Sequence, residues 1–195
     1  VITTRELGRM IREAGIDFNA LEEAEFDSPL GTGTGAAVIF GTTGGVMEAA
    51  LRTVAEVVAG KELPKLEYNE VRGMEQTRES VIDVAGVSVK VAVVHTLKSA
   101  KMMLERIKAG TADYQFIEVM ACPGGCIGGG GQPVPVDASI RQKRREAIFN
   151  CDRTSELRKS HENPEIKTLY DTWLGKPLSE KAHSLLHTHY RAQNR

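Results

Sequence analysis

The segment from Phe116 to Pro133 constrains this chain more than any other part of it. A short apolar stretch ends in two cysteines, Cys122 and Cys126, and four consecutive glycines follow at positions 128–131. Because glycine carries no side chain, the backbone of such a run can approach a bulky group closely. The two thiols beside it are soft ligands, the kind that hold iron–sulfur groups. The segment therefore predicts a loop that binds an iron–sulfur cofactor.

Two other uses of these cysteines are compatible with the residues but fit the glycines less well. A zinc ribbon or a thioredoxin-like motif spaces its cysteines as Cys-x2-Cys, whereas this loop has Cys-x3-Cys. A zinc site would also need two further ligands, and the neighbouring sequence contains no other Cys or His. A nucleophilic cysteine needs a partner histidine, for which His95 at the end of a predicted strand is the candidate.

Composition excludes several classes of protein. Apolar residues make up 41% and charged residues 26% of the 195 residues, and the net charge is −1. This is the profile of a globular protein, with no charge excess to attract nucleic acid. No apolar run approaches the ~20 residues of a bilayer span, so we expect no integral membrane protein. Three cysteines are an odd number that suits a reducing compartment, hence a cytoplasmic location, with the periplasm as the alternative. The first residue is Val1, the abrupt start expected of a fragment, a processed chain or a crop.

Hydrophobic patterns predict an α/β fold, with a mainly parallel sheet flanked by helices and an all-helical C-terminal extension. Expected strands cover 36–40, 66–72, 80–94 (a hairpin turning at Ala85–Gly86) and 115–120. Expected helices start at the Thr3/Glu6 capping box and run to Ala14, and cover 46–58, 97–109, 137–150, a segment from Pro164, and Ser179 to Tyr190. Strand patterns stop after Pro135, which divides the chain into residues 1–135 and 136–195.

Two glycine-rich loops each follow a predicted strand, one at residues 41–45 and the other at 120–131. In a parallel sheet both loops would lie at the same carboxyl edge, where α/β proteins bind ligands. We therefore expect the two loops to face one another across a single site.

At these residues the chain resembles the catalytic domain of iron-only (FeFe) hydrogenases. The third signature of that family reads Glu-x-Met-x-Cys-x-Gly-Gly-Cys-x-x-Gly-Gly-Gly-Gln-Pro, and Glu118 through Pro133 meet every defined position. Residues 1–7, 39–52 and 158–163 are similar to other landmarks of the family, so the resemblance covers essentially the whole chain. It implies that residues 1–135 are the C-terminal lobe of the catalytic, large-subunit-like domain and that 136–195 are a tail like the family's small subunit, wrapped on that lobe.

The resemblance also implies a cofactor and its ligands. In the family, four cysteines hold a 4Fe-4S cluster (the cubane of the H-cluster), and one of them bridges to a two-iron subcluster with carbonyl, cyanide and dithiolate ligands. By motif position, Cys122 is a cubane ligand, and Cys126 is both a cubane ligand and the bridging thiolate. Met120, Phe40 and Gly41 line the two-iron pocket. The implied reaction is the reversible oxidation of hydrogen to protons and electrons.

Other family features are absent from this sequence. The signatures that carry the other two cluster cysteines, the lysine that contacts a cyanide and the proton-shuttling cysteine do not occur here. The resemblance thus implies that the N-terminal half of the catalytic domain, in the same or a separate chain, is a required partner. Ferredoxin or NAD(P)-linked subunits would exchange electrons, and the isolated chain is expected to be inactive. Two alternatives within the same fold are an iron–sulfur assembly or interaction protein without the two-iron subcluster, and a hydrogen sensor.

Several other residues are expected to have ordinary structural roles. Cys151 is predicted to be a packed thiol, and His183 and His187 are predicted to be structural residues on one helix face. The cationic segment 141–145 is typical of a solvated helix face, with docking of an acidic electron carrier as the less favoured use. Glu118 is predicted either to accept backbone hydrogen bonds in the loop or to form an ordinary salt bridge.

Overall fold

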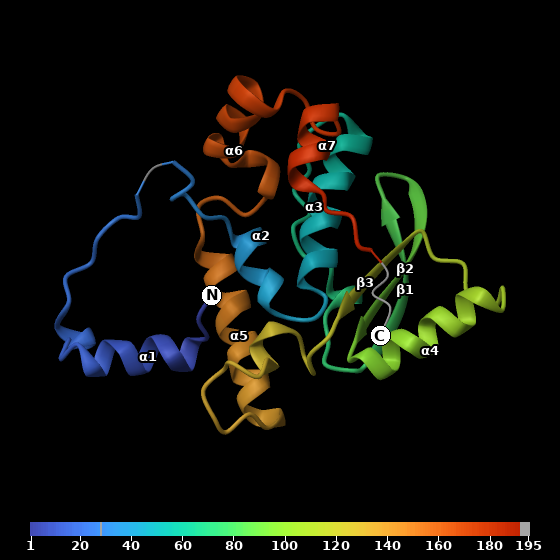
Figure 1. Cartoon of the computed structure of the whole chain (residues 1–195). Helices are drawn as coiled ribbons and strands as arrows, with labels where there is room; N and C mark the ends of the chain where they lie inside the picture. Colours follow the sequence, from blue (N-terminus) through green and yellow to red (C-terminus); the bar gives the residue numbers. More distant parts are fainter. Residues whose placement is uncertain (28, 192–195) are drawn as a thin grey trace.

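The computed structural model describes residues 1–27 and 29–191. Its helices and strands are α1 (Thr4–Glu13), α2 (Gly35–Val38), α3 (Gly45–Ala59), β1 (Thr77–Val84), β2 (Val87–His95), α4 (Leu97–Lys108), β3 (Phe116–Met120), α5 (Ala138–Thr154), α6 (Pro164–Leu169) and α7 (Glu180–Leu186). Short 3-10 turns are η1 (Phe18–Ala20), η2 (Ile39–Gly41), η3 (Asn69–Val71), η4 (Cys126–Gly128) and η5 (Ser160–Glu162), and η6 (Tyr170–Leu174) is a π-helical turn. Figure 1 shows this arrangement.

A mixed sheet lies between α3 and α4, with strand order β1-β2-β3. β1 and β2 form the predicted antiparallel hairpin, whose turn residues Ala85 and Gly86 both have positive φ, as a tight two-residue hairpin turn requires. β2 and β3 are parallel, with His95 opposite Met120. The α/β class with a helical C-terminal part is confirmed, but the sheet is mixed rather than mainly parallel, because one of its two strand pairs is the hairpin.

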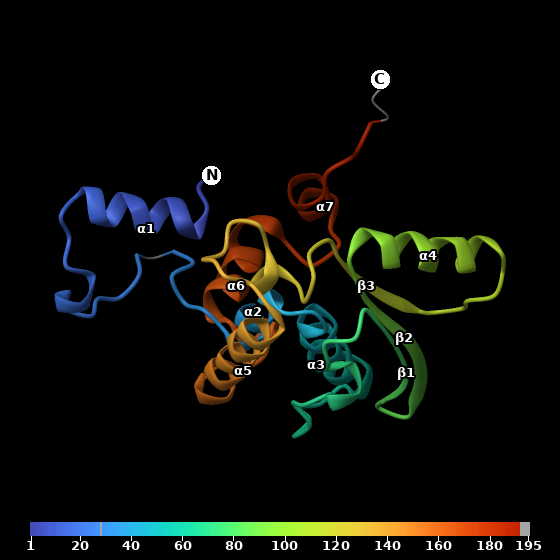
Figure 2. The same cartoon turned by 90° about the horizontal axis from the view of Figure 1, so that it is seen from below.

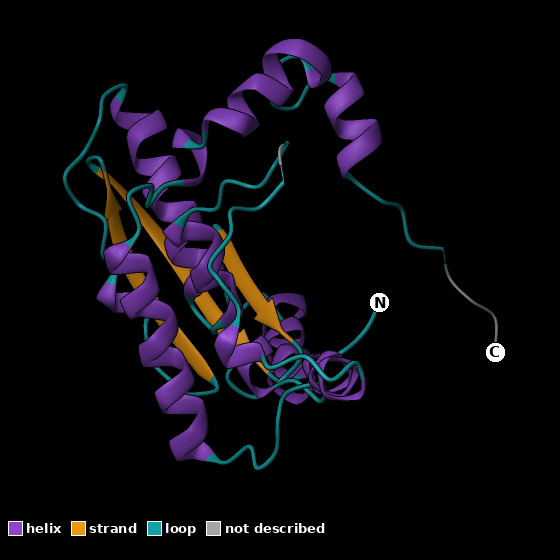
Figure 3. Cartoon of the chain, turned by 90° about the vertical axis from the view of Figure 1, so that its left-hand side faces the viewer, coloured by secondary structure: helices purple, strands orange, loops and turns teal. Residues whose placement is uncertain are grey.

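Helices cover both faces of the sheet (Figures 2 and 3). Alternate residues of β2 point to opposite faces, as in any strand. Val91 and Val93 pack in the cluster that includes α3, whereas Ala92 and Val94 pack with Met103 of α4. Because both faces of the strand are buried in its second half, residues 91–94 form a continuous apolar run. Each helix in the described residues is too short or too polar to cross a membrane.

Two predicted strands are wrong. The segment 36–40 forms α2 and η2, because the Thr34 side chain accepts a hydrogen bond from Ala37 N and starts a helix there. The segment 66–72 contains η3, whose Val71 is buried in the core beside Tyr68. Short apolar runs fit a buried strand and a buried helical turn equally well, which explains both errors.

Several of the predicted helix ends are confirmed. Thr3 and Glu6 form the capping box of α1, Gly60 ends α3 and Ser179 begins α7, which stops at Leu186 rather than Tyr190. The first helix buries none of its side chains and stands apart from the body in Figure 1. Arg5 joins it to the glycine run by donating to the carbonyls of Gly131 (backbone N, 3.3 Å) and Gly130 (side chain, 2.7 Å).

Helix α5 packs against the lobe through a small apolar cluster. Phe149 of α5 lies with Ala36, Ile39 and Ala49, which come from α2, η2 and α3. Cys151 is exposed, so the predicted packed thiol is wrong; it lies on the outer side of α5 while Asp152, its neighbour, is fully buried. The rings of His183 and His187 stack on one another with 4.5 Å between their centroids, and both residues are exposed.

Candidate functional site

The cysteine loop leaves the sheet at Met120 and folds back on itself through backbone hydrogen bonds. Gly125 N donates to Cys122 O at 3.0 Å, and Gly129 N donates to Cys126 O at 3.0 Å. The Gln132 side chain donates to the same Cys126 carbonyl at 3.2 Å. Each cysteine therefore begins a closed turn, so the positions of the two residues are fixed by the loop's own backbone.

Glycine is sterically required at several points of this loop. At Gly125, where φ is +95°, a Cβ atom would lie 2.8 Å from Met120 Sδ and 2.8 Å from Thr43 N. At Gly128 it would lie only 2.0 Å from Pro123 O. Both distances are below any real Cβ contact, so the loop can adopt this path only without side chains at these positions.

The two glycine-rich loops touch, as predicted. Thr43 N donates to Gly124 O at 3.0 Å, and Arg78 of β1 holds the Thr43 hydroxyl with a 3.0 Å hydrogen bond. The predicted reason was wrong, because the first loop follows η2 rather than a parallel strand. The loops meet because the amino end of α3 packs beside the end of β3, where Glu118 links the two elements.

Glu118 is buried and caps α3. Its carboxylate accepts from Gly44 N at 2.6 Å and from Met47 N at 2.8 Å. Of the two predicted roles, the structure shows backbone hydrogen bonds, made to the amino end of α3 rather than within the cysteine loop. Burial raises the pKa of Glu118, and the two amide bonds offset part of that rise.

The five predicted site residues lie close together in the fold. Cys122 is half-buried and Cys126 is exposed at the start of η4. Met120 and Gly41 both lie against Gly125. A Cβ atom added at Gly125 would lie 2.8 Å from Met120 Sδ and 3.0 Å from Gly41 O. Phe40, next to Gly41 in η2, is exposed, with 46% of its surface accessible. This is the placement expected for residues lining one site, and their individual roles stay predictions.

Sequence reasoning missed the arginines of α5. Arg144 donates to Ile127 O and to Pro133 O, both at 2.8 Å. Arg141 packs on the backbone of the loop, where its Cδ would lie 3.2 Å from a Cβ added at Gly124 and 3.1 Å from one added at Gly128. The solvated-face interpretation of segment 141–145 is therefore wrong for these residues. Helix α5 clamps the cysteine loop, and a charge pattern alone gives no signal of bonds to distant carbonyls.

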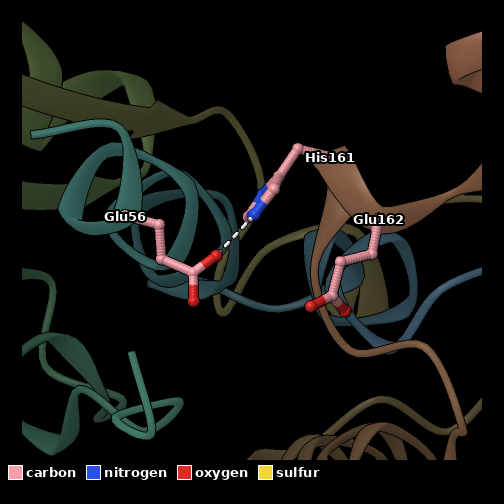
Figure 4. A group of neighbouring side chains, drawn as sticks. All are labelled: Glu56, His161 and Glu162. Carbon is pink, nitrogen blue, oxygen red and sulfur yellow. Dashed lines mark hydrogen bonds and ion pairs between the residues drawn. The ribbon is translucent and has the colours of Figure 1, made fainter. Parts of the chain in front are cut away.

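A second group of candidate metal ligands lies away from this loop. Glu56, His161 and Glu162 bring ligand atoms together, and the His161 ring points at the Glu56 carboxylate (Figure 4), with Nε2 2.7 Å from Oε2. The ammonium group of buried Lys159 lies 2.8 Å from Glu56 Oε1 and 2.9 Å from Glu162 Oε1. A cation thus already lies between the two carboxylates, so we interpret the group as an ion-pair cluster that joins α3 to η5.

Comparison with known families identifies the chain. The family model "Iron only hydrogenase large subunit, C-terminal domain" matches residues 1–130, and "Iron hydrogenase small subunit" matches residues 138–193. The chain belongs to the iron-only hydrogenase family. It is 49% identical to the NADP-reducing hydrogenase subunit HndD of Solidesulfovibrio fructosivorans, over 100% of this chain and 33% of that protein. It is 41% identical to iron hydrogenase 1 of Clostridium pasteurianum, over 98% of this chain and 34% of that protein.

Solved structures agree with this assignment. FeFe-hydrogenase HydA1 of Chlamydomonas reinhardtii superposes with a TM-score of 0.76 at 47% identity, covering 97% of this chain and 55% of that one. Relatives at lower identity include protein NAR1 of Arabidopsis thaliana, which is 32% identical over 97% of this chain and 41% of that protein. The chain spans about a third of the length of the curated hydrogenases it matches.

The residues of this chain fit part of an iron–sulfur cofactor site. Cys122 and Cys126 are thiol donors suited to iron, and a Cβ at Gly129 would lie 4.0 Å from Cys122 Sγ, with open space beside Gly130. Thr42, between Gly41 and Thr43, has a buried hydroxyl without a hydrogen-bond partner among the described residues. Such an unpaired group is expected where a polar group from outside the chain completes the site.

Proposed function

We propose that this chain supplies the C-terminal half of the H-cluster site of an iron-only hydrogenase, which oxidises hydrogen reversibly. The observation that carries the proposal is the cysteine loop, which is closed by its own backbone and held by Thr43 on one side and Arg144 on the other. The match of Glu118 through Pro133 to the family signature supports it.

Under this proposal Cys122 and Cys126 would both hold the 4Fe-4S cluster as thiolate ligands, and Cys126 would also be the thiolate shared with the two-iron subcluster. Met120, Phe40 and Gly41 form part of the wall of the two-iron pocket. Once the rest of the domain covers them, Met120 and Phe40 exclude water, while Gly41 leaves room for the cofactor. The loop backbone orients both thiolates before iron arrives.

When bound, the cubane supplies electron transfer and the two-iron subcluster supplies the point at which hydrogen is formed or split. This chain contributes thiolate ligation and an apolar boundary, both of which tune the reduction potential of such a cluster. The remaining cluster cysteines and the proton path would come from the N-terminal half of the catalytic domain, so the chain alone is expected to be inactive.

The proposed organisation is a lobe at residues 1–135 and a small-subunit-like tail at 136–195. The boundary between the two family-model matches, 1–130 and 138–193, supports this division. The large subunit of the periplasmic Fe hydrogenase of Nitratidesulfovibrio vulgaris is 53% identical over 133 residues (68% of this chain and 32% of that protein), a length close to that of the proposed lobe. We propose ferredoxin or NAD(P)-linked subunits as electron partners, and a cytoplasmic location with the periplasm as the alternative.

Infrared spectroscopy tests the proposal. The chain is co-produced with the N-terminal half of the catalytic domain and the maturation proteins, and the assembled protein is examined for carbonyl and cyanide bands and for hydrogen turnover. We expect both, and we expect Cys126→Ser to abolish them, whereas Cys151→Ser, a change at the exposed thiol of α5, leaves them unchanged. Absence of the bands from a protein that contains the cubane would overturn the proposal.

The relatives at lower identity give the second candidate function. Protein NAR1 and the mouse cytosolic iron–sulfur assembly component 3 (29% identical over 98% of this chain and 41% of that protein) cover nearly all of this chain. An assembled protein with a cubane but without carbonyl and cyanide bands would match that alternative. Bands without appreciable turnover would instead favour a hydrogen sensor.

A further inference from the structure

His95 is a buried residue that the proposed mechanism does not use. It ends β2, lies opposite Met120 of β3 in the sheet, and has only 4% of its surface exposed. The strand thus delivers an imidazole ring to the place where the cysteine loop leaves the sheet. Sequence reasoning considered this histidine as the partner of a nucleophilic thiol, but both hydrogen bonds of the ring are to backbone groups.

The two bonds define which ring nitrogen carries the proton. Gly124 N lies 3.3 Å from Nδ1, and Met74 O lies 3.2 Å from Nε2. A backbone N–H only donates and a carbonyl only accepts, so Nδ1 is the acceptor and Nε2 carries the hydrogen. The neutral ring bridges the loop before β1 to the cysteine loop.

Gly124 lies midway between the two cysteines and is held at both ends. His95 accepts from its N–H, while its carbonyl accepts from Thr43 N at 3.0 Å. The φ angle of Gly124 is +79°, which residues with a side chain rarely adopt. A Cβ atom added at Gly124 would also lie 2.8 Å from Met74 Cε. The peptide that separates Cys122 from Cys126 therefore takes its orientation from His95 and Thr43.

We infer that His95 is a positioning residue, which presets the two thiols for iron by fixing the Gly124 amide. The identity of the group that the thiols hold rests on the proposed function, but the positioning itself does not. Groups that orient metal ligands typically change metal affinity by about 10- to 100-fold when they are removed. We expect an effect of that size from losing the acceptor at Nδ1.

Two amide substitutions separate the two hydrogen bonds of the ring. In His95→Asn the side-chain oxygen reaches the position of Nδ1 and can still accept from Gly124 N. In His95→Gln the longer side chain places its amide near the position of Nε2, where it can donate to Met74 O but leaves Gly124 N without an acceptor. Both variants are polar and differ by one methylene, so general effects of replacing the ring are matched.

The readouts are the hydrogen exchange rate of the Gly124 amide, followed by NMR, and the affinity of the chain for Co²⁺, followed by thiolate-to-cobalt absorption. In His95→Gln we expect Gly124 exchange to be at least about tenfold faster and Co²⁺ affinity about 10- to 100-fold weaker, because a buried N–H loses its acceptor. His95→Asn should remain within about threefold of the wild type in both, a margin set by the usual context dependence of such bonds. His183→Asn, on the exposed face of α7, is the matched control and should change neither.

Wild-type behaviour of His95→Gln would overturn the inference, as would equal losses in the Asn and Gln variants. Neither readout needs the two-iron subcluster. Missing carbonyl and cyanide bands in the assembled protein would therefore refute the proposed function and leave this inference standing. Unchanged Co²⁺ affinity in His95→Gln would refute this inference and leave the proposed function standing.

Discussion

Arg52 of α3 and Asp152 of α5 form a bidentate ion pair that is closed to solvent. Nη1 lies 2.7 Å from Oδ1 and Nη2 lies 2.9 Å from Oδ2, and both side chains have 0% exposure. Glu48, also fully buried, accepts from Arg52 at 2.8 Å and from Arg72 at 2.7 Å, so four charges alternate in sign across the contact between α3 and α5. Burial opposes ionisation of Asp152, but hydrogen bonds from Arg52 and Arg158 outweigh it and lower the pKa of Asp152.

Asp152→Asn should therefore destabilise the fold strongly. It leaves Arg52 charged and buried with a weaker partner, and breaking a buried ion pair typically costs about 3–5 kcal/mol. We expect a decrease of that order in the free energy of unfolding, measured by urea denaturation. Asp113→Asn is the control: Asp113 pairs with Lys90 on the surface, with side-chain exposures of 80% and 49%, and should cost no more than about 1 kcal/mol. Equal effects of the two changes would contradict the role given to Asp152.

Arg144→Met should loosen the cysteine loop while leaving α5 in place. Methionine keeps most of the apolar stem but loses the donors to Ile127 O and Pro133 O. Hydrogen bonds made by a charged donor contribute about 1.5–3 kcal/mol, so we expect the rate of thiol modification at Cys122 to rise by about tenfold or more. Modification is timed with a thiol reagent in a Cys126→Ser, Cys151→Ser background, because both of those thiols are exposed and would react as well. Lys143→Met, at an exposed position of the same helix, should leave the rate unchanged.

Glu118→Gln tests the link between β3 and α3. The carboxylate accepts from Gly44 N and Met47 N at the positive end of the helix dipole. An amide retains one acceptor oxygen but presents an NH₂ group to the second backbone N–H. We expect a loss of about 1.5–3 kcal/mol in the free energy of unfolding at pH 7, measured by urea denaturation. A neutral or stabilising result would show that relief from burying the charge exceeds the cost of leaving one backbone N–H without an acceptor.

Acid should weaken the contact between α3 and η5 through Glu56. Burial opposes ionisation of Glu56, but the Leu63 amide, Lys159 and His161 outweigh it and lower the pKa of Glu56 to about 2, from an ordinary value of 4.5. The unfolded chain therefore takes up this proton at a higher pH than the folded chain. The stabilisation is present above pH 4.5 and is lost as pH falls toward 2.

Urea denaturation across this pH range measures the effect. The difference in free energy of unfolding between wild type and Glu56→Gln should shrink steadily from pH 5 to pH 2. Glu105→Gln, which removes an exposed partner of Lys101 on α4, is the control and should give a small difference at each pH. A constant difference for Glu56→Gln would indicate that the carboxylate titrates normally.

Local signals predicted a large part of the fold. The Thr3/Glu6 capping box, Gly60 after α3, the Ala85–Gly86 turn and Ser179 before α7 act within a few residues, so the sequence displays them directly. The cysteine motif was visible for the same reason. The strands expected at 36–40 and 66–72 failed because an apolar run becomes a strand only if a neighbouring strand pairs with it.

The rest of the site depends on contacts that no local pattern contains. Glu118 reaches Gly44 across 74 residues, and Arg52 reaches Asp152 across 100. Arg144 resembles any other cation of an amphipathic helix until the loop carbonyls that it binds are placed beside it. Which charged residue becomes a clamp is decided by tertiary packing.

The supports of the cysteine loop also set an order of events during synthesis. Thr43 and His95 emerge from the ribosome before the loop does, but Arg144 follows Ile127, the residue whose carbonyl it binds, by 17 positions. The loop is therefore complete only after α5 has been translated and has folded back on it. Until then the two thiols lie in turns closed by the loop's own backbone but without the restraint from Arg144, so we expect the cofactor to reach the finished loop only after the tail has been translated.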